Sequence, residues 1–208
     1  MNQSILACSA LLFGGLLLAP LVSQPDSGDA AARLAPSVAA TTWTVDPVHS
    51  SVGFRIKHCQ TAWFYGRFDA LSGSVTLDPE KPEASSVQFA VETGSVNTGN
   101  KDRDDHLRSP DFFNAKVNPK IAFQSTKVAR EAKDRYSVTG KLSLHGVEKE
   151  IVMTAEFNGS GKNVQGAEIA GFEASFQLNR SDFGITAYPD ALGEAVRITV
   201  AIEATKQG

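Results

Sequence analysis

The chain has 208 residues, of which 42% are hydrophobic and 21% are charged, and its formal net charge is −3. That length suits one domain with a sizeable core, or at most two small domains. Because the charge is balanced and runs of like charge are short, the composition gives no electrostatic reason for binding to nucleic acid or for strong attraction to an anionic membrane.

The N-terminal part of the chain is an apolar run at residues 5–22, followed by a stretch rich in Ala, Pro, Ser and Asp. The run is typical of a secretory signal peptide, and we interpret residues 1–22 in this way. It is also long enough to be retained as an uncleaved membrane anchor. Residues 23–41 are expected to be a flexible linker, and residues 42–208 the folded domain. These features predict a periplasmic or secreted protein.

From residue 48 onward, apolar and polar residues alternate in eight stretches. They lie at residues 48–58, 75–77, 87–91, 121–123, 136–144, 151–157, 172–178 and 196–202. A period of two indicates strands with one buried and one solvent-facing side, as in antiparallel sheets. Turn residues separate several stretches, at Asp78-Pro79, Asn158-Gly159 and residues 163–166. The pattern predicts an all-β fold with a closed or two-layered antiparallel sheet, and an eight-stranded barrel can hold one small ligand.

The aromatic residues are mostly phenylalanine, with 12 Phe against 3 Tyr and 2 Trp. A phenylalanine ring needs no hydrogen-bond partner when buried, so this bias favours an unusually apolar interior, although a large solid core accounts for it equally well. We expect the inward positions to line one continuous cavity. The residues predicted to line it are Phe54, Ile56, Phe89, Phe123, Phe172, Phe176, Val196 and Val200.

One segment departs from the strand pattern. A charged, helix-compatible run at residues 101–108 leads into Phe112 and Phe113. We expect a short helical flap at about residues 100–113 that covers one end of the sheet, with the two rings capping the cavity.

The charged residues of this flap have two interpretations. Arg103 and His106 are candidate contacts to the polar head group of a ligand, because a cation at a cavity mouth attracts an anionic group. Alternatively, the cations of the segment pair with Asp102, Asp104 and Asp105 and only hold its shape. Asp104 and Asp105 themselves are most simply a solvated helix face.

The sequence predicts no catalytic site, no metal and no cofactor. The four histidines, His49, His58, His106 and His145, show no short ligand spacing of the kind found in zinc enzymes. Residues 94–101 superficially resemble a phosphate loop but lack its hydroxyl residue, and there is no nucleophile elbow. Cys59 is the only cysteine of the predicted domain, so an internal disulfide is excluded there.

Six motifs occur in order over about residues 43–204. They are Trp43-Thr-Val-Asp46-Pro-Val-His49-Ser50 with the following residues to His58, Tyr65-Gly66-Arg67-Phe68, Arg103-Asp104-Asp105-His106-Leu107 with the following residues to Phe113, Pro119-Lys-Ile121-Ala-Phe123, Gly140-Lys-Leu-Ser-Leu144-His145-Gly146-Val147 and Arg180-Ser181-Asp182-Phe183-Gly184-Ile185. Together they resemble the bacterial YceI-like family.

The resemblance implies a lipocalin-like eight-stranded barrel that carries or sequesters a polyisoprenoid or a similar fatty amphiphile, usually in the periplasm. Two alternatives belong to other classes of protein. One is an isoprenoid-quinone-linked enzyme that uses His106 or Cys59, and the other is a stress-response binding module with a protein partner. Contact with a membrane is expected to be transient or through an uncleaved N-terminal anchor. Whether two copies form a homodimer stays open.

Overall fold

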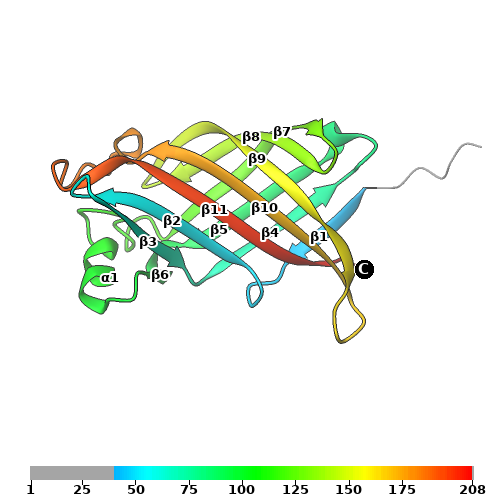
Figure 1. Ribbon diagram of the computed structural model, residues 1–208, viewed down its shortest axis with the longest axis horizontal. Helices are drawn as coiled ribbons and strands as arrows, with labels where there is room; N and C mark the ends of the chain where they lie inside the picture. The colour runs from blue at the N-terminus through cyan, green and yellow to red at the C-terminus, as the bar shows by residue number, and fades with distance from the viewer. Residues whose placement is uncertain (1–39, 208) are drawn as a thin grey trace, which may run out of the picture. The chain divides into compact units, whose positions relative to one another are not determined.

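The alternating stretches of the sequence become the strands of a β-barrel in the computed structural model, which describes residues 40–207 (Figure 1). The strands are β1 Thr41–Val45, β2 Ser51–His58, β3 Ala62–Phe68, β4 Leu71–Leu77, β5 Ser86–Glu92, β6 Val96–Asn97, β7 Lys120–Ala132, β8 Arg135–Leu144, β9 Val147–Lys162, β10 Glu168–Asn179 and β11 Leu192–Lys206. The helices are α1 Lys101–Arg108 and the short 3-10 turns η1 Pro82–Ala84, η2 Thr93–Ser95 and η3 Arg180–Phe183. The predicted signal peptide, and the predicted linker up to residue 39, lie outside the described residues.

The sheet closes on itself because β1 pairs with both β4 and β11. Around the ring the order is β1-β4-β5-β7-β8-β9-β10-β11, and every pairing is antiparallel. The strands β2, β3 and β6 extend the same sheet beyond the ring toward the end at which α1 lies. The all-β antiparallel sheet predicted from the alternation is therefore confirmed, and so is the eight-stranded barrel with a short helix that the family resemblance implies.

Besides the two-residue strand β6, two strands are absent from the eight alternating stretches, β1 and β3. In both cases a barrel strand is interrupted, so that β1 and β2 pair in succession with β11, and β3 and β4 follow each other closely along the chain. β3 does alternate in burial, but its outward positions carry Trp63 and Tyr65 in place of polar residues. The contrast in polarity that marks a half-buried strand is therefore missing from its sequence.

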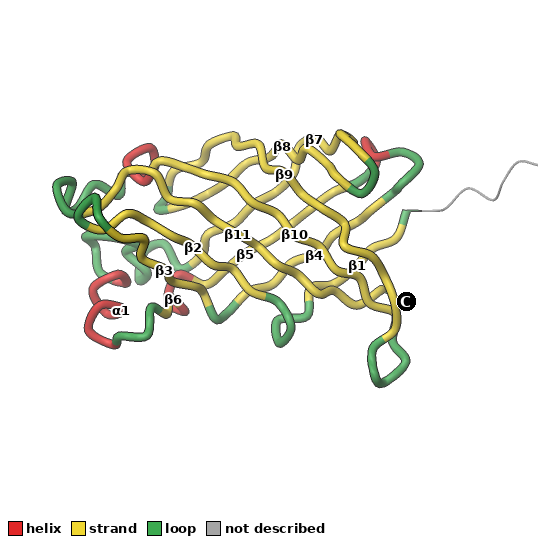
Figure 2. The backbone as a smooth tube through the Cα atoms, viewed as in Figure 1, coloured by secondary structure: helices red, strands yellow, loops and turns green. Residues whose placement is uncertain are grey.

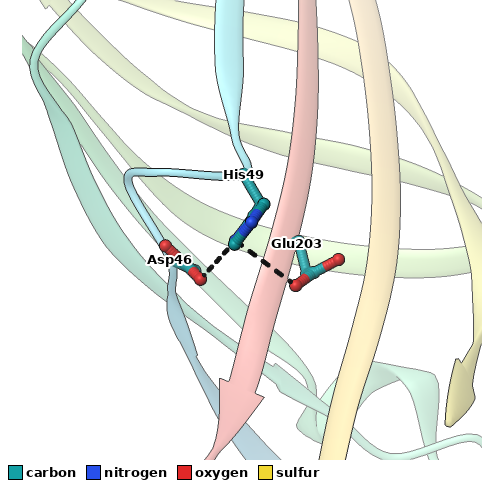
Figure 3. Close-up of side chains that lie close together, drawn as sticks. All are labelled: Asp46, His49 and Glu203. Atoms are coloured by element: carbon teal, nitrogen blue, oxygen red, sulfur yellow. Dashed lines mark hydrogen bonds and ion pairs between the residues drawn. The ribbon is translucent and has the colours of Figure 1, made fainter. Parts of the chain in front are cut away.

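Hydrogen bonds hold the bend between β1 and β2 against β11. Figure 3 shows Asp46 and His49 of this bend beside Glu203 of β11. The hydroxyl of Ser50 donates to the carbonyl of Glu203 and accepts from its backbone N–H, both at 3.0 Å. The backbone N–H of Asp46 donates to the same carbonyl at 2.9 Å, and a carboxylate oxygen of Asp46 accepts from the N–H of Val48 at 2.8 Å. These bonds replace the missing rungs of the ladder, so the barrel stays closed through the bend.

One predicted turn is wrong. Asn158-Gly159 lies inside the long strand β9, and the pairing of β9 with β10 shifts by one residue between Gly171 and Phe172. Gly159 has a φ of 119°, so the pair forms a bulge in the strand and not a hairpin turn. The turn predicted at residues 163–166 connects β9 to β10 as expected.

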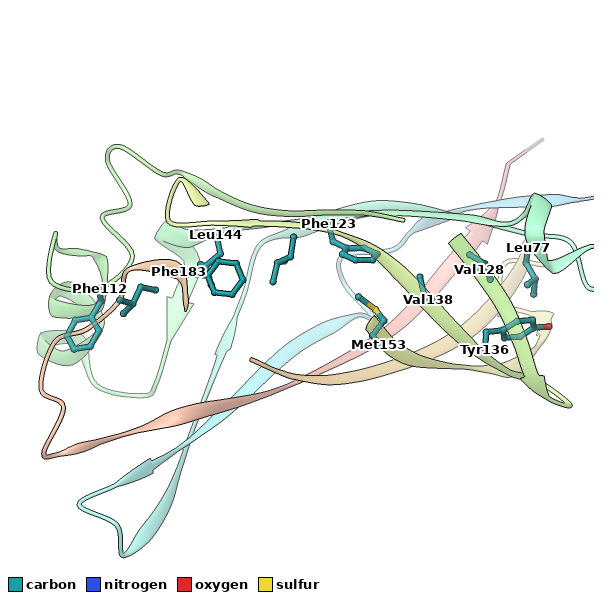
Figure 4. Close-up of a cluster of buried hydrophobic side chains, with 11 residues drawn as sticks. Leu77, Phe112, Phe123, Val128, Tyr136, Val138, Leu144, Met153 and Phe183 are labelled. Atoms are coloured by element: carbon teal, nitrogen blue, oxygen red, sulfur yellow. The ribbon is translucent and has the colours of Figure 1, made fainter. Parts of the chain in front are cut away.

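Side chains fill the end of the barrel opposite α1. Figure 4 shows Leu77, Val128, Tyr136 and Val138 gathered at that end, away from Phe112 and Phe183. A second buried cluster at the filled end joins Trp43, Ala170 and Ala204, with Phe157 and Phe172 packed against it. Helices and loops cover the opposite end (Figure 2). The barrel is therefore filled at one end, and its functional features are expected at the other, where α1 lies.

Candidate functional site

The interior of the barrel between the filled end and α1 is a cavity of about 590 Å³. Its wall is formed by Val52, Phe54 and Ile56 of β2, Phe64 and Phe68 of β3, Val87, Phe89 and Val91 of β5, Ile121, Ala122 and Phe123 of β7, Leu142 and Leu144 of β8, Met153 of β9, Ala174, Phe176 and Leu178 of β10, and Val196, Ile198, Val200 and Ile202 of β11. All of these side chains are apolar. The volume lies within the range of roughly 300–1,000 Å³ that is usual for small-molecule sites.

Glycines on neighbouring strands make room for the rings that line this cavity. A Cβ atom at Gly66 would lie 2.3 Å from the Cζ of Phe54, and one at Gly140 would lie 2.4 Å from the Cζ of Phe123. Each ring therefore lies over the bare backbone of the adjacent strand. The close approach lets a large aromatic residue occupy the wall while space remains inside the barrel.

The structure places every predicted apolar residue on the cavity wall except Phe172. Those on the wall are Phe54, Ile56, Phe89, Phe112, Phe113, Phe123, Phe176, Val196 and Val200. Phe172 is a correction: its ring packs against Phe157 in the filled end, with 5.5 Å between the ring centroids. Alternation identifies the inward face of β10 but not how far along the barrel the cavity extends, and Phe172 lies beyond its floor.

The cavity reaches the surface at the α1 end, which we call the mouth. Several residues that line it there are exposed, among them His58, Arg103 and Tyr188, the last with 53% of its surface exposed. The other lining residues at the mouth are His106, Leu107, Phe112, Phe113, Arg180, Ile185, Ala191 and Leu192. The polar groups of the lining are therefore confined to one end, and the remainder is apolar.

The helix α1 begins where the sequence predicts the flap, and two side chains fix its start. The side-chain oxygen of Asn100 accepts from the backbone N–H of Arg103 at 3.0 Å, which caps the helix. A carboxylate oxygen of Asp104 accepts from both the N–H and the hydroxyl of Thr98, at 2.8 and 2.6 Å. Asp104 is 8% exposed, so its interpretation as part of a solvated helix face is wrong, whereas Asp105 is exposed.

The paired aromatic residues after α1 close part of the mouth. Phe112 is 8% exposed and stacks on Tyr188 with 6.0 Å between the centroids and an interplanar angle of 9°. Phe113 meets the ring of Phe68 edge-on at 5.4 Å. The two rings thus join the flap to the loop before β11 and to the wall of the barrel.

Arg103 lies at the mouth without an acidic partner. Its Nε donates to the hydroxyl of Thr98 at 2.8 Å, its Nη2 donates to the carbonyl of Thr98 at 2.9 Å, and its guanidinium lies 4.4 Å from the centre of the Phe64 ring. Within residues 40–207, no carboxylate lies within 4.0 Å of this side chain. Its orientation is fixed by neutral groups, which leaves its positive charge available to the cavity.

The other basic residues of the flap each contact a carboxylate. Arg108 and Lys101 both contact Asp105, and Nε2 of His106 lies 3.0 Å from a carboxylate oxygen of Asp111. Of the two predicted head-group contacts, His106 therefore has an acidic neighbour, whereas Arg103 has none among the described residues. The alternative interpretation, that the cations of the segment hold its shape, describes Arg108 and Lys101 but not Arg103.

Arg180 is a lining residue that the sequence singled out only as part of a motif. It is 4% exposed and donates to four backbone carbonyls, those of Ile185, Ala187, Leu192 and Gly193, at 2.7–3.3 Å. The guanidinium thereby ties the connection between β10 and β11 to the rim of the barrel. The sequence signal was an arginine between an apolar strand and a turn glycine, which carries no information about burial.

Asp46, His49 and Glu203 form the one group of metal-ligating side chains found among the described residues (Figure 3). Nδ1 of His49 lies 2.8 Å from Asp46 and 3.7 Å from Glu203. The hydrogen bond to Asp46 raises the pKa of His49 above 6.5 and lowers the pKa of Asp46 below 3.8. These contacts link the bend between β1 and β2 to Glu203 of β11.

Cys59 lies in the turn between β2 and β3 at the rim of the mouth, directly after His58, the last residue of β2. Cys59 is exposed, and its Sγ is 3.8 Å from Nε2 of His58. This places the thiol beside the cavity, while His58 faces into it.

Within residues 40–207, no helix combines the length and apolar character needed to span a bilayer.

Comparison with known proteins gives a consistent result. The family model described as a YceI-like domain matches residues 43–204. A protein of Azotobacter vinelandii named UPF0312 protein is 39% identical over 159 residues, which cover 76% of this chain and 83% of that protein. Protein YceI of Salmonella newport is 36% identical over 159 residues, with the same shares covered.

Solved structures share the fold. BcnA of Burkholderia cenocepacia is 26% identical with a TM-score of 0.71, and the match covers 77% of this chain and 99% of that one. The YCEI protein of Campylobacter jejuni is 33% identical with a TM-score of 0.62, covering 79% and 98%. A polyisoprenoid binding domain from Saccharophagus degradans has a TM-score of 0.62 over the same shares at 16% identity, a likeness of fold alone.

Proposed function

This chain belongs to the YceI-like family, and we propose that its barrel binds the apolar tail of a long-chain amphiphile of the polyisoprenoid type and carries or sequesters it away from water. The observation that carries the proposal is the cavity, which is apolar along its whole wall and bears cationic groups only at the mouth. Such a distribution of polarity matches a molecule with one long apolar part and one polar end. Burial of an apolar tail is favourable by about 25 cal/mol for each Å² removed from water.

The related proteins support the same class of ligand. The Saccharophagus degradans domain, which has the same fold, is described as polyisoprenoid binding. The wall of the cavity in this chain is apolar, and the head group of the bound molecule is our inference from its own residues. We propose that the polar end is anionic and contacts Arg103, because that guanidinium lines the cavity and, among residues 40–207, has no carboxylate beside it.

We also propose that the protein acts in the periplasm or outside the cell. The support is the apolar run at residues 5–22 in the sequence. Cell fractionation with detection of the size of the product tests this proposal. A shortened product in the periplasm or the medium supports it, whereas a full-length cytoplasmic product contradicts it.

The binding proposal is tested by purifying the protein without detergent, extracting it with organic solvent and identifying the extract by mass spectrometry. We expect a long-chain lipid at near-stoichiometric amount. The variant Phe176→Asp, which places a charge on the middle of the wall, should lose the lipid, and the exposed variant Val164→Asp should retain it.

Two other results would favour the alternative functions. Chemical conversion of the extracted lipid on incubation with the protein would indicate an enzyme, with His106 or Cys59 as the groups to test. An empty barrel that co-purifies with another protein would indicate a binding module.

The variant Arg103→Gln separates the head-group proposal from the carrier proposal. It should lower the affinity for an anionic amphiphile roughly tenfold, because it removes a charge-assisted hydrogen bond. The affinity for a neutral amphiphile should stay unchanged.

A further inference from the structure

The outer wall of the barrel beside the mouth carries cations and aromatic rings on three neighbouring strands. Arg197 of β11 lies opposite Arg55 of β2, and Arg55 lies opposite Tyr65 of β3. One outward position closer to the turn, Lys57 of β2 lies opposite Trp63 of β3. These five residues form what we call the mouth-side patch.

The aromatic rings of the patch are held facing outward. Trp63 and Tyr65 are 43% and 61% exposed. The guanidinium carbon of Arg55 lies 4.5 Å, and Nζ of Lys57 lies 4.7 Å, from the centre of the Trp63 ring. The indole is thus supported by two cations and has an open surface, an unusual position for a tryptophan in a chain that contains only two.

The cations of the patch are not neutralised. Within the described part of the chain, no carboxylate lies within 4.0 Å of Arg55, Lys57 or Arg197, and Nε of Arg55 is buried without a hydrogen-bond partner. The neighbouring Arg67, in contrast, pairs with Asp69 at 2.8 Å. The chain as a whole has a net charge of −3, so its composition does not reveal that the mouth-side patch is basic.

The patch adjoins the mouth directly. Along β3, Trp63 and Tyr65 alternate with Phe64, which lines the cavity, and along β2, Lys57 alternates with Ile56 and His58, which also line it. Figure 1 shows the turn between β2 and β3 at the same end of the barrel as α1. Any surface that binds the patch therefore lies next to the entrance of the cavity.

We propose that the mouth-side patch docks the barrel onto an anionic lipid surface. Tryptophan and tyrosine favour the interface between head groups and acyl chains, because their rings are apolar with one polar end. Arginine and lysine beside them attract the phosphates of anionic lipids. A role of this docking in loading or releasing cargo rests on the carrier function proposed above, whereas the docking itself does not.

Quenching of tryptophan fluorescence tests the proposal at one residue. Of the two tryptophans, Trp43 is 8% exposed in the filled end and Trp63 is in the patch. We expect vesicles of phosphatidylglycerol with brominated acyl chains to quench the Trp63 emission, and brominated phosphatidylcholine vesicles to leave it unchanged. Raising the salt concentration should weaken the quenching. The variant Trp63→Phe should remove the quenched component.

A pair of triple variants separates the patch from general charge. Arg55→Gln/Lys57→Gln/Arg197→Gln removes three patch cations, and Lys81→Gln/Lys127→Gln/Lys133→Gln removes three exposed lysines of the other end of the barrel. The first variant should bind phosphatidylglycerol vesicles roughly 100-fold more weakly than the wild type, as expected for three interfacial cations. The second should bind within about twofold of it. All proteins are used as the full chain, so any contribution of residues 5–22 is common to them.

The proposal is overturned if anionic vesicles do not quench Trp63, which is the result expected if the patch binds an acidic protein instead. It is also overturned if both triple variants weaken vesicle binding equally. Lipid content of the same preparations is measured by mass spectrometry. A patch variant that keeps its cargo but no longer docks supports the docking surface. Preparations that contain no cargo at all count against the carrier function, and the quenching result then still decides the docking proposal.

Discussion

The ring of Phe54 covers the backbone of Gly66 so closely that a Cβ atom at position 66 would lie 2.3 Å from its Cζ. The two residues are directly opposite on β2 and β3, and Phe54 is part of the cavity wall. The size of the cavity on this side is therefore set by a glycine that does not itself line it. The ring of Phe123 also covers a glycine of the neighbouring strand, Gly140, although its partner in register is Leu142.

Gly66→Ala should force the Phe54 ring into the cavity. Overpacking of this kind costs about 1–3 kcal/mol, so we expect a lower free energy of unfolding in denaturant titrations and less co-purified lipid. Gly94→Ala is the control, because a Cβ at Gly94 meets nothing within 4 Å. The double variant Gly66→Ala/Phe54→Ala should relieve the clash. If Gly66→Ala alone leaves the stability unchanged, the Phe54 ring moves aside at no energetic cost and the prediction is wrong.

Phe112→Ala should destabilise the mouth. The ring is 8% exposed and packs against Tyr188 and His106, and truncation of a buried phenylalanine costs about 3–5 kcal/mol. Val117→Ala, in the same connection but 71% exposed, should change stability by less than about 0.5 kcal/mol. Thermal and chemical unfolding compare the two. If the two variants melt alike, the aromatic stack does not hold the flap.

Arg180→Met should loosen the connection between β10 and β11. The substitution leaves four backbone carbonyls without their donor, and a hydrogen bond to a charged group is worth about 1.5–3 kcal/mol. We expect a loss of at least roughly 3 kcal/mol in stability and faster amide exchange in the connection. Arg135→Met removes an exposed arginine near Glu131 and should cost no more than about 1 kcal/mol. Equal losses in the two variants would show that the buried arginine is dispensable.

The alternation of residues predicted an antiparallel sheet, because each of the eight stretches falls in a different strand, but it did not distinguish a closed sheet from a two-layered one. It could not predict β3, whose outward side carries aromatic residues, and it could not show that Phe172 lies below the cavity floor. A period of two assigns a side chain to the inner or outer face and contains no information about its depth in the barrel.

The charges of the site were less predictable than its apolar residues. The flap sequence alternates acids and bases, so Arg103 and Arg108 look equivalent, yet only Arg108 pairs with an acid. The cations of the mouth-side patch come from β2 and β11, which are far apart in the sequence. Their proximity depends on the register of the sheet, which no local pattern specifies.

The ion pair of His49 and Asp46 should make the stability of the bend between β1 and β2 dependent on pH. In the folded protein the pKa of His49 is raised, first by its hydrogen bond to Asp46, and the pKa of Asp46 is lowered, first by the same bond. A raised histidine pKa contributes stability that is complete below about 6.5 and is lost as pH rises through the folded value. A lowered aspartate pKa contributes stability above about 3.8 that is lost as pH falls through the folded value.

The pair should therefore stabilise the fold most between these two limits. We expect the melting temperature of the wild type to exceed that of His49→Gln at about pH 5, and the difference to shrink by about pH 8. Asp46→Asn is the matched control: an NMR titration of the His49 ring should then give a pKa closer to 6.5, with only Glu203 left to raise it. A difference in melting temperature that stays constant from pH 5 to 8 would show that the neutral ring serves the bend equally well, and that its packing matters more than its charge.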